Sequence, residues 1–225
     1  MTTTVSAPAT EERADAPHRL GGRLLDAADL LAFAALLNAL VLIGTLAGGI
    51  VLGVAPSLAA AATCSRHRLL GNGGSTIRLF FSVWRTQFLR ANIVQAPAAL
   101  ALGLLLINAS ALWGASPAIA IPCVVIAAFV FIIQLIATVL DAQYDVARRS
   151  VLLLAARFAL QAPGAPLLLA ASVALVGAVT AFIPGLLPVI SVGAGIYLAT
   201  ALCLSFFAAN DERVAAHQPL VEDDE

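Results

Sequence analysis

The densest polar segment of this 225-residue chain lies at positions 141–149, between two long apolar stretches. Two carboxylates, a phenol and two guanidinium groups stand there, on Asp141, Tyr144, Asp145, Arg148 and Arg149. On a continuing helix Asp145 would pair with Arg148 and Arg149, because residues three and four apart share a helix face. A salt-bridged helix end is therefore the main interpretation. A docking site for a cytoplasmic partner is the alternative, and an enzymatic use of Asp141, Tyr144 and Asp145 is a third.

The remaining reactive residue types form no pattern that points to catalysis. The three cysteines lie far apart in apolar sequence without a CxxC spacing, which is typical of small buried side chains. The three histidines have no companion ligands at metal spacing. Phosphate-binding glycine loops and a GxSxG nucleophile motif do not occur. We therefore expect no catalytic residue, metal or cofactor, and a protein that is not an enzyme.

Composition indicates that these residues sit on membrane helices. The chain is 61% hydrophobic and 11% charged, against about 25% charged residues in soluble domains. Residues 30–65, 91–140 and 158–210 contain no Asp, Glu, Lys or Arg, and each exceeds the roughly 18 apolar residues that indicate a membrane helix. The fold class expected is all-α, a polytopic transmembrane helical bundle in a lipid bilayer. A net charge of −1 gives no electrostatic case for nucleic acid.

The two ends of the chain differ in composition from the apolar part. Residues 1–23 are rich in Thr, Ala, Pro and mixed charge, and are expected to form a disordered tail. They show no signal-peptide pattern, so the first helix is expected to stay in the mature protein. Residues 24–210 are the expected membrane domain, and residues 211–225 the expected acidic, disordered tail.

The number of crossings depends on the first apolar stretch. A helix needs about 20 residues to cross about 30 Å of hydrocarbon, so residues 91–140 and 158–210 hold two crossings each, whereas residues 30–65 are short for two. All twelve basic residues are arginines, and six crossings place every one on the cytoplasmic side, together with both termini. About six helices are predicted, or five if the first hairpin is one crossing plus a re-entrant helix. The expected spans are 26–48, 54–70, 92–113, 117–140, 165–183 and 188–209.

Small residues and one amide should pack the first hairpin. In lipid, helices associate through close contact of small residues and through hydrogen bonds. Proline is tolerated in the first turn of a helix, so Pro56 is expected to open the second helix. The candidates for helix packing or a helix break are Asn38, Gly44, Gly48, Gly49, Gly53 and Pro56.

An amphipathic segment follows this hairpin. Ser75 is placed to cap a helix whose aromatic residues recur at three- and four-residue steps. Arg78, Trp84 and Arg85 are expected to lie in the headgroup layer, the arginines at lipid phosphates and the indole at the interface. Residues 148–162 are expected to repeat the arrangement.

Two stretches carry a family resemblance. Asn38 is followed by Leu52-Gly53-x-x-Pro56, and then by Phe80-Phe81-x-x-Trp84-Arg85-x-x-Phe88-x-x-Ala91-Asn92. These stretches resemble the YesL-like family of uncharacterised bacterial membrane proteins. The resemblance implies a multi-pass protein of the bacterial cytoplasmic membrane, often encoded beside binding-protein-dependent carbohydrate importers, with no established catalytic residues.

The leading functional hypothesis follows from this resemblance. We expect a protein that is accessory to carbohydrate uptake or regulates it, by binding carbohydrate ABC transporter subunits or a membrane sensor. The alternative is a small permease or lipid-handling protein, which would use neutral polar residues and the broken first hairpin as a pathway.

Overall fold

A computed structural model describes residues 15–144 and 147–217, and these residues are almost entirely helical and contain no strand. The helices are α1 (Asp15–Ala47), α2 (Val51–Leu69), α3 (Thr76–Leu112), α4 (Pro117–Gln143), α5 (Val151–Gln161), α6 (Gly164–Phe182) and α7 (Val192–His217). A 3-10 turn (Pro184–Leu186) and a short π-helix (Leu187–Ser191) lead into α7. The predicted all-α class is confirmed.

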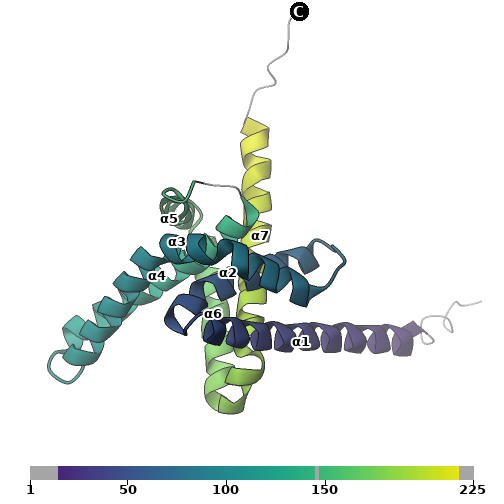
Figure 1. The fold of residues 1–225 in the computed structure, drawn as a ribbon, viewed down its shortest axis with the longest axis horizontal. Helices are drawn as coiled ribbons and strands as arrows, with labels where there is room; N and C mark the ends of the chain where they lie inside the picture. The colour runs from purple at the N-terminus through teal and green to yellow at the C-terminus, as the bar shows by residue number, and fades with distance from the viewer. Residues whose placement is uncertain (1–14, 145–146, 218–225) are drawn as a thin grey trace, which may run out of the picture.

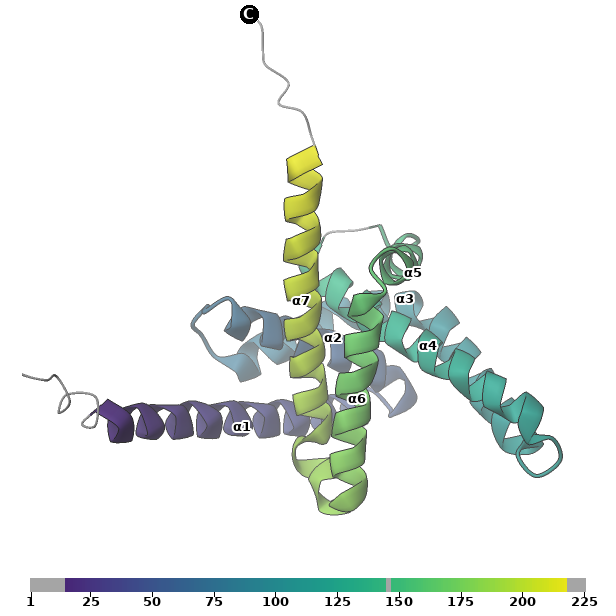
Figure 2. The same cartoon turned by 180° about the vertical axis from the view of Figure 1, so that it is seen from behind.

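The helices cross at large angles instead of running in parallel. In Figures 1 and 2, α6 and α7 lie side by side, whereas α1 runs across them. The α3–α4 hairpin slants away to the opposite side from the start of α1 and ends in a turn far from the other helices. Helix α2 packs against α1, α3, α4 and α7, and it is therefore the centre of the fold.

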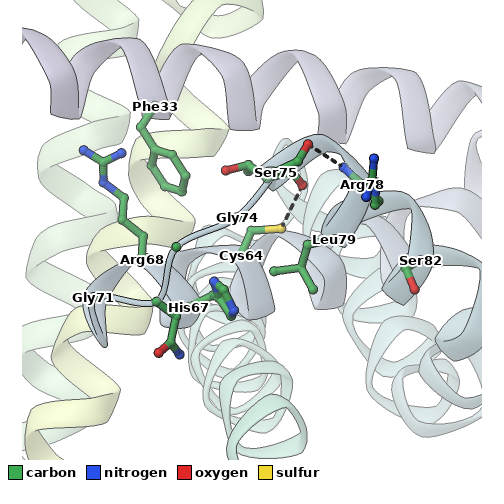
Figure 3. Close-up of a pocket in the computed structure, with 13 residues that line it drawn as sticks. Phe33, Cys64, His67, Arg68, Gly71, Gly74, Ser75, Arg78, Leu79 and Ser82 are labelled. Atoms are coloured by element: carbon green, nitrogen blue, oxygen red, sulfur yellow. Dashed lines mark hydrogen bonds between the residues drawn. The ribbon is translucent and has the colours of Figure 1, made fainter.

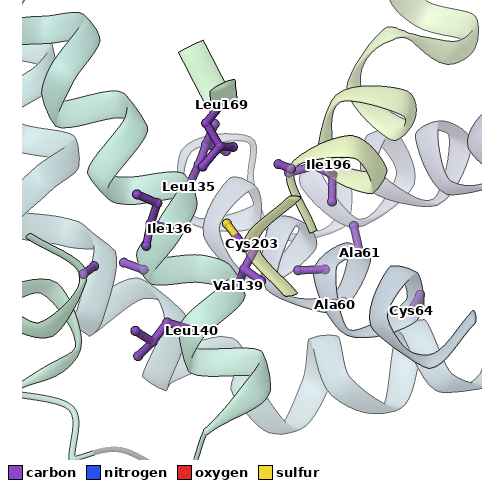
Figure 4. Close-up of a cluster of buried hydrophobic side chains, with 14 of the residues drawn as sticks. Ala60, Ala61, Cys64, Leu135, Ile136, Val139, Leu140, Leu169, Ile196 and Cys203 are labelled. Carbon is purple, nitrogen blue, oxygen red and sulfur yellow. The ribbon is translucent and has the colours of Figure 1, made fainter. Parts of the chain in front are cut away.

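The core is built mainly by α1, α2, α4 and α7, and Figure 4 shows the part around α2, α4 and α7. Helix α2 contributes a run of small side chains, Ala60, Ala61 and Ala62, all fully buried. Small side chains let the larger ones of α4 approach the α2 backbone closely. The buried partners include Leu135, Ile136, Val139 and Leu140 of α4, Leu169 of α6, and Ile196, Cys203 and Phe207 of α7.

Among the described residues, five helices are long and apolar enough to cross a membrane, so the protein is membrane-embedded. They cover Leu25–Ala47, Thr76–Leu112, Pro117–Gln143, Gly164–Phe182 and Pro188–Glu212. Helix α2 is not among them, because Arg66, His67 and Arg68 occupy its last turn. The uncharged part, residues 51–65, has a length of only about 22 Å at 1.5 Å per residue. Helix α2 is the helix that the sixth crossing of the prediction would need, and both termini lie on one side only if α2 returns the chain across the first hairpin.

The boundaries differ from expectation at three places. Helix α1 begins at Asp15, inside the expected tail, and α7 continues to His217, past the expected end of the membrane domain. Helix α3 runs unbroken from Thr76, so the expected interfacial helix is the first part of a membrane helix. Ser75 caps it by accepting a hydrogen bond from the Arg78 amide. The second expected interfacial helix is a separate element, α5.

Glycines allow α1 and α2 to touch along the first hairpin. A Cβ on Gly53 would lie 2.2 Å from the Thr45 carbonyl oxygen, and one on Gly48 would lie 2.3 Å from Gly53 Cα. A Cβ on Gly44 would lie 2.5 Å from Ser57 Oγ. Gly49, with φ +77°, makes the turn, where a side chain would be strained.

Pro56 lies inside α2 and not in its first turn, which corrects the expectation that it opens this helix. A proline within a helix has no N–H to donate to the carbonyl four residues earlier, here that of Leu52. The structure supplies another donor, because Asn92 Nδ2 of α3 lies 2.9 Å from the Leu52 oxygen. The same nitrogen also donates to the Phe88 carbonyl oxygen at 2.8 Å. The interior proline is therefore compatible with a continuous α2.

Candidate functional site

Polar side chains gather where α2, α4 and α7 end, and the strongest contact there joins α3 to α4. Arg90 donates to Asp141 through Nη2, 2.6 Å from Oδ1, and through Nε, 3.2 Å from the same oxygen. The two side chains are only 20% and 12% exposed. A paired charge tolerates such burial, whereas losing one partner is costly. This ion pair is therefore positioned to hold α3 against α4.

Two further contacts join the helix ends. Arg66 donates to the Gln143 side-chain oxygen, which links the end of α2 to the end of α4. Arg68 pairs with Asp29 of α1 at 2.5 Å, and its guanidinium lies 4.5 Å from the centre of the Phe33 ring. The Asp29 pair is largely exposed, so its energy is small. The pair nevertheless shows that the first part of α1 lies beside the end of α2.

Tyr144 connects α4 to α7. Helix α4 ends at Gln143, and Tyr144 follows in extended backbone, with φ −119° and ψ 141°. Its hydroxyl donates to Asp211 Oδ2 at 2.8 Å. Burial raises the pKa of Tyr144 to about 12, helped by the hydrogen bond to Asp211 and by the charge of that carboxylate. The phenol is therefore a neutral donor at physiological pH, and it orients the carboxylate.

A pocket of about 440 Å³ adjoins this contact. The ring centres of Tyr144 and Phe207 are 5.7 Å apart, and those of Phe158 and Phe207 are 5.0 Å apart, both pairs edge to face. The pocket is lined by Leu140 and Tyr144, by Leu154, Phe158 and Gln161 of α5, and by Phe207, Asn210 and Asp211 of α7. We call it the aromatic pocket. Several aromatic rings and a carboxylate thus line the same cavity.

The structure divides the segment that the sequence singled out. Asp141 and Tyr144 contact Arg90 and Asp211 within the chain, while the side chains of Arg148 and Arg149 are exposed. Asp145 lies outside the described residues. Helix α4 ends at Gln143, and Arg148 and Arg149 lie in a turn that precedes α5.

A second, larger pocket lies beside the glycine-rich loop at residues 71–74, between α2 and α3 (Figure 3). It has a volume of about 530 Å³, and His67, Arg68 and Arg78 contribute to its wall. These basic side chains do not converge, because Arg68 points toward Phe33 of α1 and His67 points to the other side of the loop. The arrangement therefore lacks a common point at which one anion would meet all three.

The three residues expected at the lipid interface, Arg78, Trp84 and Arg85, differ in exposure. Arg78 and Arg85 are exposed, as a headgroup position requires. Trp84 is half-buried against the core, and its Nε1 lies 3.1 Å from where a Cβ on Gly44 would be. The reason is geometric: Trp84 is one turn from the fully buried Phe80 and shares its inward face. The indole of Trp84 is therefore turned partly inward, and its depth relative to the headgroup layer stays a prediction.

Asn38 is fully buried and bonds to the start of α7. Its Nδ2 donates to the Pro188 carbonyl oxygen at 2.5 Å. Its Oδ1 accepts from the amides of Val192 and Gly193 at 2.9 and 3.1 Å. The first amides of a helix have no partner within the helix, and in lipid an unpaired amide is expensive. One side chain of α1 thus accepts hydrogen bonds from the first two amides of α7.

Comparison with known proteins places part of this architecture in a family. Residues 34–109 match a family model described as "Protein of unknown function, DUF624". This family is the YesL-like domain of unknown function, so the match agrees with the resemblance drawn from the sequence. The chain matches no curated protein and no solved structure.

The matched segment includes the later part of α1, all of α2 and most of α3. It therefore holds Asn38, the glycine contacts of the first hairpin, Pro56 and Asn92. The aromatic pocket lies outside it, on α4, α5 and α7. Within the described residues, no group of three or more His, Cys, Asp or Glu side chains is arranged to hold a metal ion.

Sequence reasoning missed three residues at the polar helix ends, Arg90, Phe207 and Asp211. Arg90 and Asp141 are 51 positions apart, so no local spacing could pair them. Phe207 follows a long apolar run and looks like any other lipid-facing aromatic. Asp211 was assigned to the acidic tail. A signal was present in its position four residues after Phe207, which places both on one face if the helix continues.

Proposed function

We propose that this protein is accessory to carbohydrate uptake or regulates it, at the bacterial cytoplasmic membrane. It acts by binding a transporter subunit or a membrane sensor and carries out no reaction of its own. The YesL-like resemblance supplies the carbohydrate context. The observation that carries the binding role is the α3–α4 hairpin, which stands away from the other helices in both views (Figures 1 and 2).

The outer half of this hairpin has open apolar sides. Leu104 and Ile107 of α3 are 61% and 66% exposed, and Val125 of α4 is exposed to a similar degree. A Cβ added at Gly103 would meet nothing within 4 Å, so this glycine lies on an open face. A glycine on an open membrane face allows another helix to approach closely. The surface therefore suits membrane helices of a transporter subunit.

The charge distribution supports an orientation. Arginines flank α2, α3 and α5 at the polar helix ends, and the tip of the α3–α4 hairpin, residues 113–116, has none. By the positive-inside rule the arginine-rich end faces the cytoplasm. The Asp29–Arg68 pair supports a cytoplasmic N-terminus, because it brings the start of the first hairpin to the same end as its finish.

Affinity purification tests the proposal. The full chain, tagged and extracted in mild detergent, should recover permease or ATPase subunits of a carbohydrate importer. Gly103→Leu should lower that recovery at least fivefold by blocking the open face. Gly114→Leu is the matched control, because it lies at the hairpin tip and its Cβ also meets nothing within 4 Å. Absence of importer subunits, or equal recovery with both variants, would contradict the proposal.

A second candidate, a small permease or lipid-handling protein, is favoured by one observation. A groove of about 310 Å³ lies between α4, α6 and α7, and Leu58 of α2 also lines it. Its wall is apolar except for the hydroxyls of Thr180 and Ser191, 2.7 Å apart. Purified protein in liposomes would then move sugar or lipid, and Ser191→Ala would slow that flux. No flux of either substrate would count against this candidate.

A further inference from the structure

The aromatic pocket has the chemistry of a cation site. The ring faces of Tyr144, Phe158 and Phe207 carry negative electrostatic potential, which attracts a cation within about 6 Å of a ring centre. Asp211 adds a full negative charge to the same wall. The two ion pairs formed by described arginines and acids use Asp29 and Asp141, not Asp211. The described chain therefore provides a carboxylate and three rings without providing the cation.

Geometry fixes this carboxylate in place. The Tyr144 hydroxyl donates to Oδ2 of Asp211, and edge-to-face contacts with Phe207 hold the Tyr144 ring. Phe158 contacts Phe207 from α5. The wall is thus assembled from three helices before any ligand arrives, and such preorganisation lowers the entropic cost of binding.

The pocket lies beside an amphipathic helix with exposed apolar and basic side chains. On α5, Leu160 is 72% exposed, as expected of a helix whose outer face contacts lipid. Arg157 is exposed and lies three residues after Leu154 and four before Gln161, which places it on their side of α5, and Phe158 follows it directly. An arginine on this stripe is suited to bind a phosphate, so a cation site and an anion-binding side chain lie next to each other.

Adjacent groups of opposite charge fit a ligand that carries both an amine and a phosphate. We propose that the aromatic pocket binds the ammonium group of a phosphatidylethanolamine headgroup, with Arg157 at the lipid phosphate. The ammonium donates hydrogen bonds to Asp211, which a quaternary choline group has no hydrogen to form. An uncharged glycerol headgroup offers no cation to the rings. This lipid site is separate from the α3–α4 hairpin and does not depend on the proposed transporter role.

The test uses the full chain, delipidated in detergent micelles and titrated with lipids of identical acyl chains. Native mass spectrometry counts the bound lipids. Phosphatidylethanolamine should be retained at least fivefold better than phosphatidylcholine or phosphatidylglycerol. Asp211→Asn should remove that preference, and Arg157→Gln should weaken all three phospholipids together. Glu212→Gln is the matched control, since it is adjacent and exposed but does not line the pocket.

Further arms keep the outcomes distinct. Thermal unfolding of each variant shows whether it is folded, and Phe158→Leu replaces Asp211→Asn if the latter is not. Soluble phosphoethanolamine should not compete at lipid-equivalent concentration, because it lacks the acyl chains. Equal retention of the three lipids, unchanged preference in the folded variant, or full competition by soluble phosphoethanolamine would overturn the proposal. Selective binding of a lysine-rich peptide in place of the lipid would overturn it as well.

Discussion

Asn38 bonds to the amides of Val192 and Gly193 at the start of α7 and to the Pro188 carbonyl of the preceding π-helix, and these bonds are lost in Asn38→Leu. The amides of Val192 and Gly193 and the Pro188 carbonyl would then have no side-chain partner. Leaving one buried polar group unpaired costs about 1–3 kcal/mol, and hydrogen bonds between membrane helices are at the lower end of this range. We expect a loss of about 2 kcal/mol or more in the free energy of unfolding, measured in mixed micelles.

The matched control for this prediction is Asn108→Leu. Asn108 is exposed and bonds only to the Leu104 carbonyl oxygen of its own helix. Its replacement should change the unfolding free energy by less than about 0.5 kcal/mol, the usual range for a surface position. Equal effects of the two substitutions would show that Asn38 does not hold α7.

The pair formed by Pro56 and Asn92 predicts a non-additive double substitution. Asn92→Leu removes the donor to the Leu52 oxygen and should destabilise the protein by about 1 kcal/mol. Pro56→Ala restores a backbone N–H four residues after Leu52. In the Pro56→Ala background, Asn92→Leu should therefore cost clearly less. Additive unfolding free energies for the two substitutions would contradict this compensation.

At the residue scale, the sequence indicates which side chains make contacts better than it indicates their partners or the face they turn to. The amide of Asn38 was expected to bond a neighbouring helix, but its partner is 150 positions away and no local pattern names it. Trp84 was placed at the lipid interface because aromatic and basic residues alternate around it. The pattern shows that two faces exist, and only the close approach of Gly44 shows which face is inward.

At the element scale, the crossing of α1 over α7 depends on one glycine. A Cβ on Gly193 would lie 2.1 Å from the Ala34 carbonyl oxygen, a backbone atom that cannot rotate away. Gly193→Ala should therefore cost about 1–3 kcal/mol, the usual range for overpacking. Gly195→Ala, two residues further along α7, meets nothing within 4 Å and should be neutral or slightly stabilising. Thermal unfolding of both variants in detergent measures the difference.

Most of the predicted helices are present, but the predicted helix ends were less accurate than the helices themselves. Residues 117–140 and 165–183 were expected as spans, and α4 and α6 cover them closely because their charge-free runs have clear limits. Pro56 was expected at a helix start, yet a side chain from another helix compensates its missing donor. Local sequence patterns cannot predict a partner from a distant part of the chain. They also did not predict that α3 is one continuous helix.

At the scale of the whole molecule, the first hairpin determines where the chain begins relative to the membrane. Composition predicted a helical membrane protein, because few other folds contain such long stretches without a charged residue. The crossing number was ambiguous for a physical reason, since residues 51–65 are too short to span about 30 Å. Neither composition nor length could show that Arg68 returns to Asp29, 39 positions earlier.

This pairing predicts that both termini lie on the cytoplasmic side. Ser6→Cys and Glu225→Cys, each made with the half-buried Cys123 replaced by alanine, should react with an impermeant maleimide in inverted vesicles and not in intact cells. Gly114→Cys at the tip of the α3–α4 hairpin should show the opposite pattern. Buried Cys64 and Cys203, 2% and 1% exposed, should stay unlabelled and give a low background. Labelling of Ser6→Cys from outside intact cells would contradict the predicted cytoplasmic N-terminus.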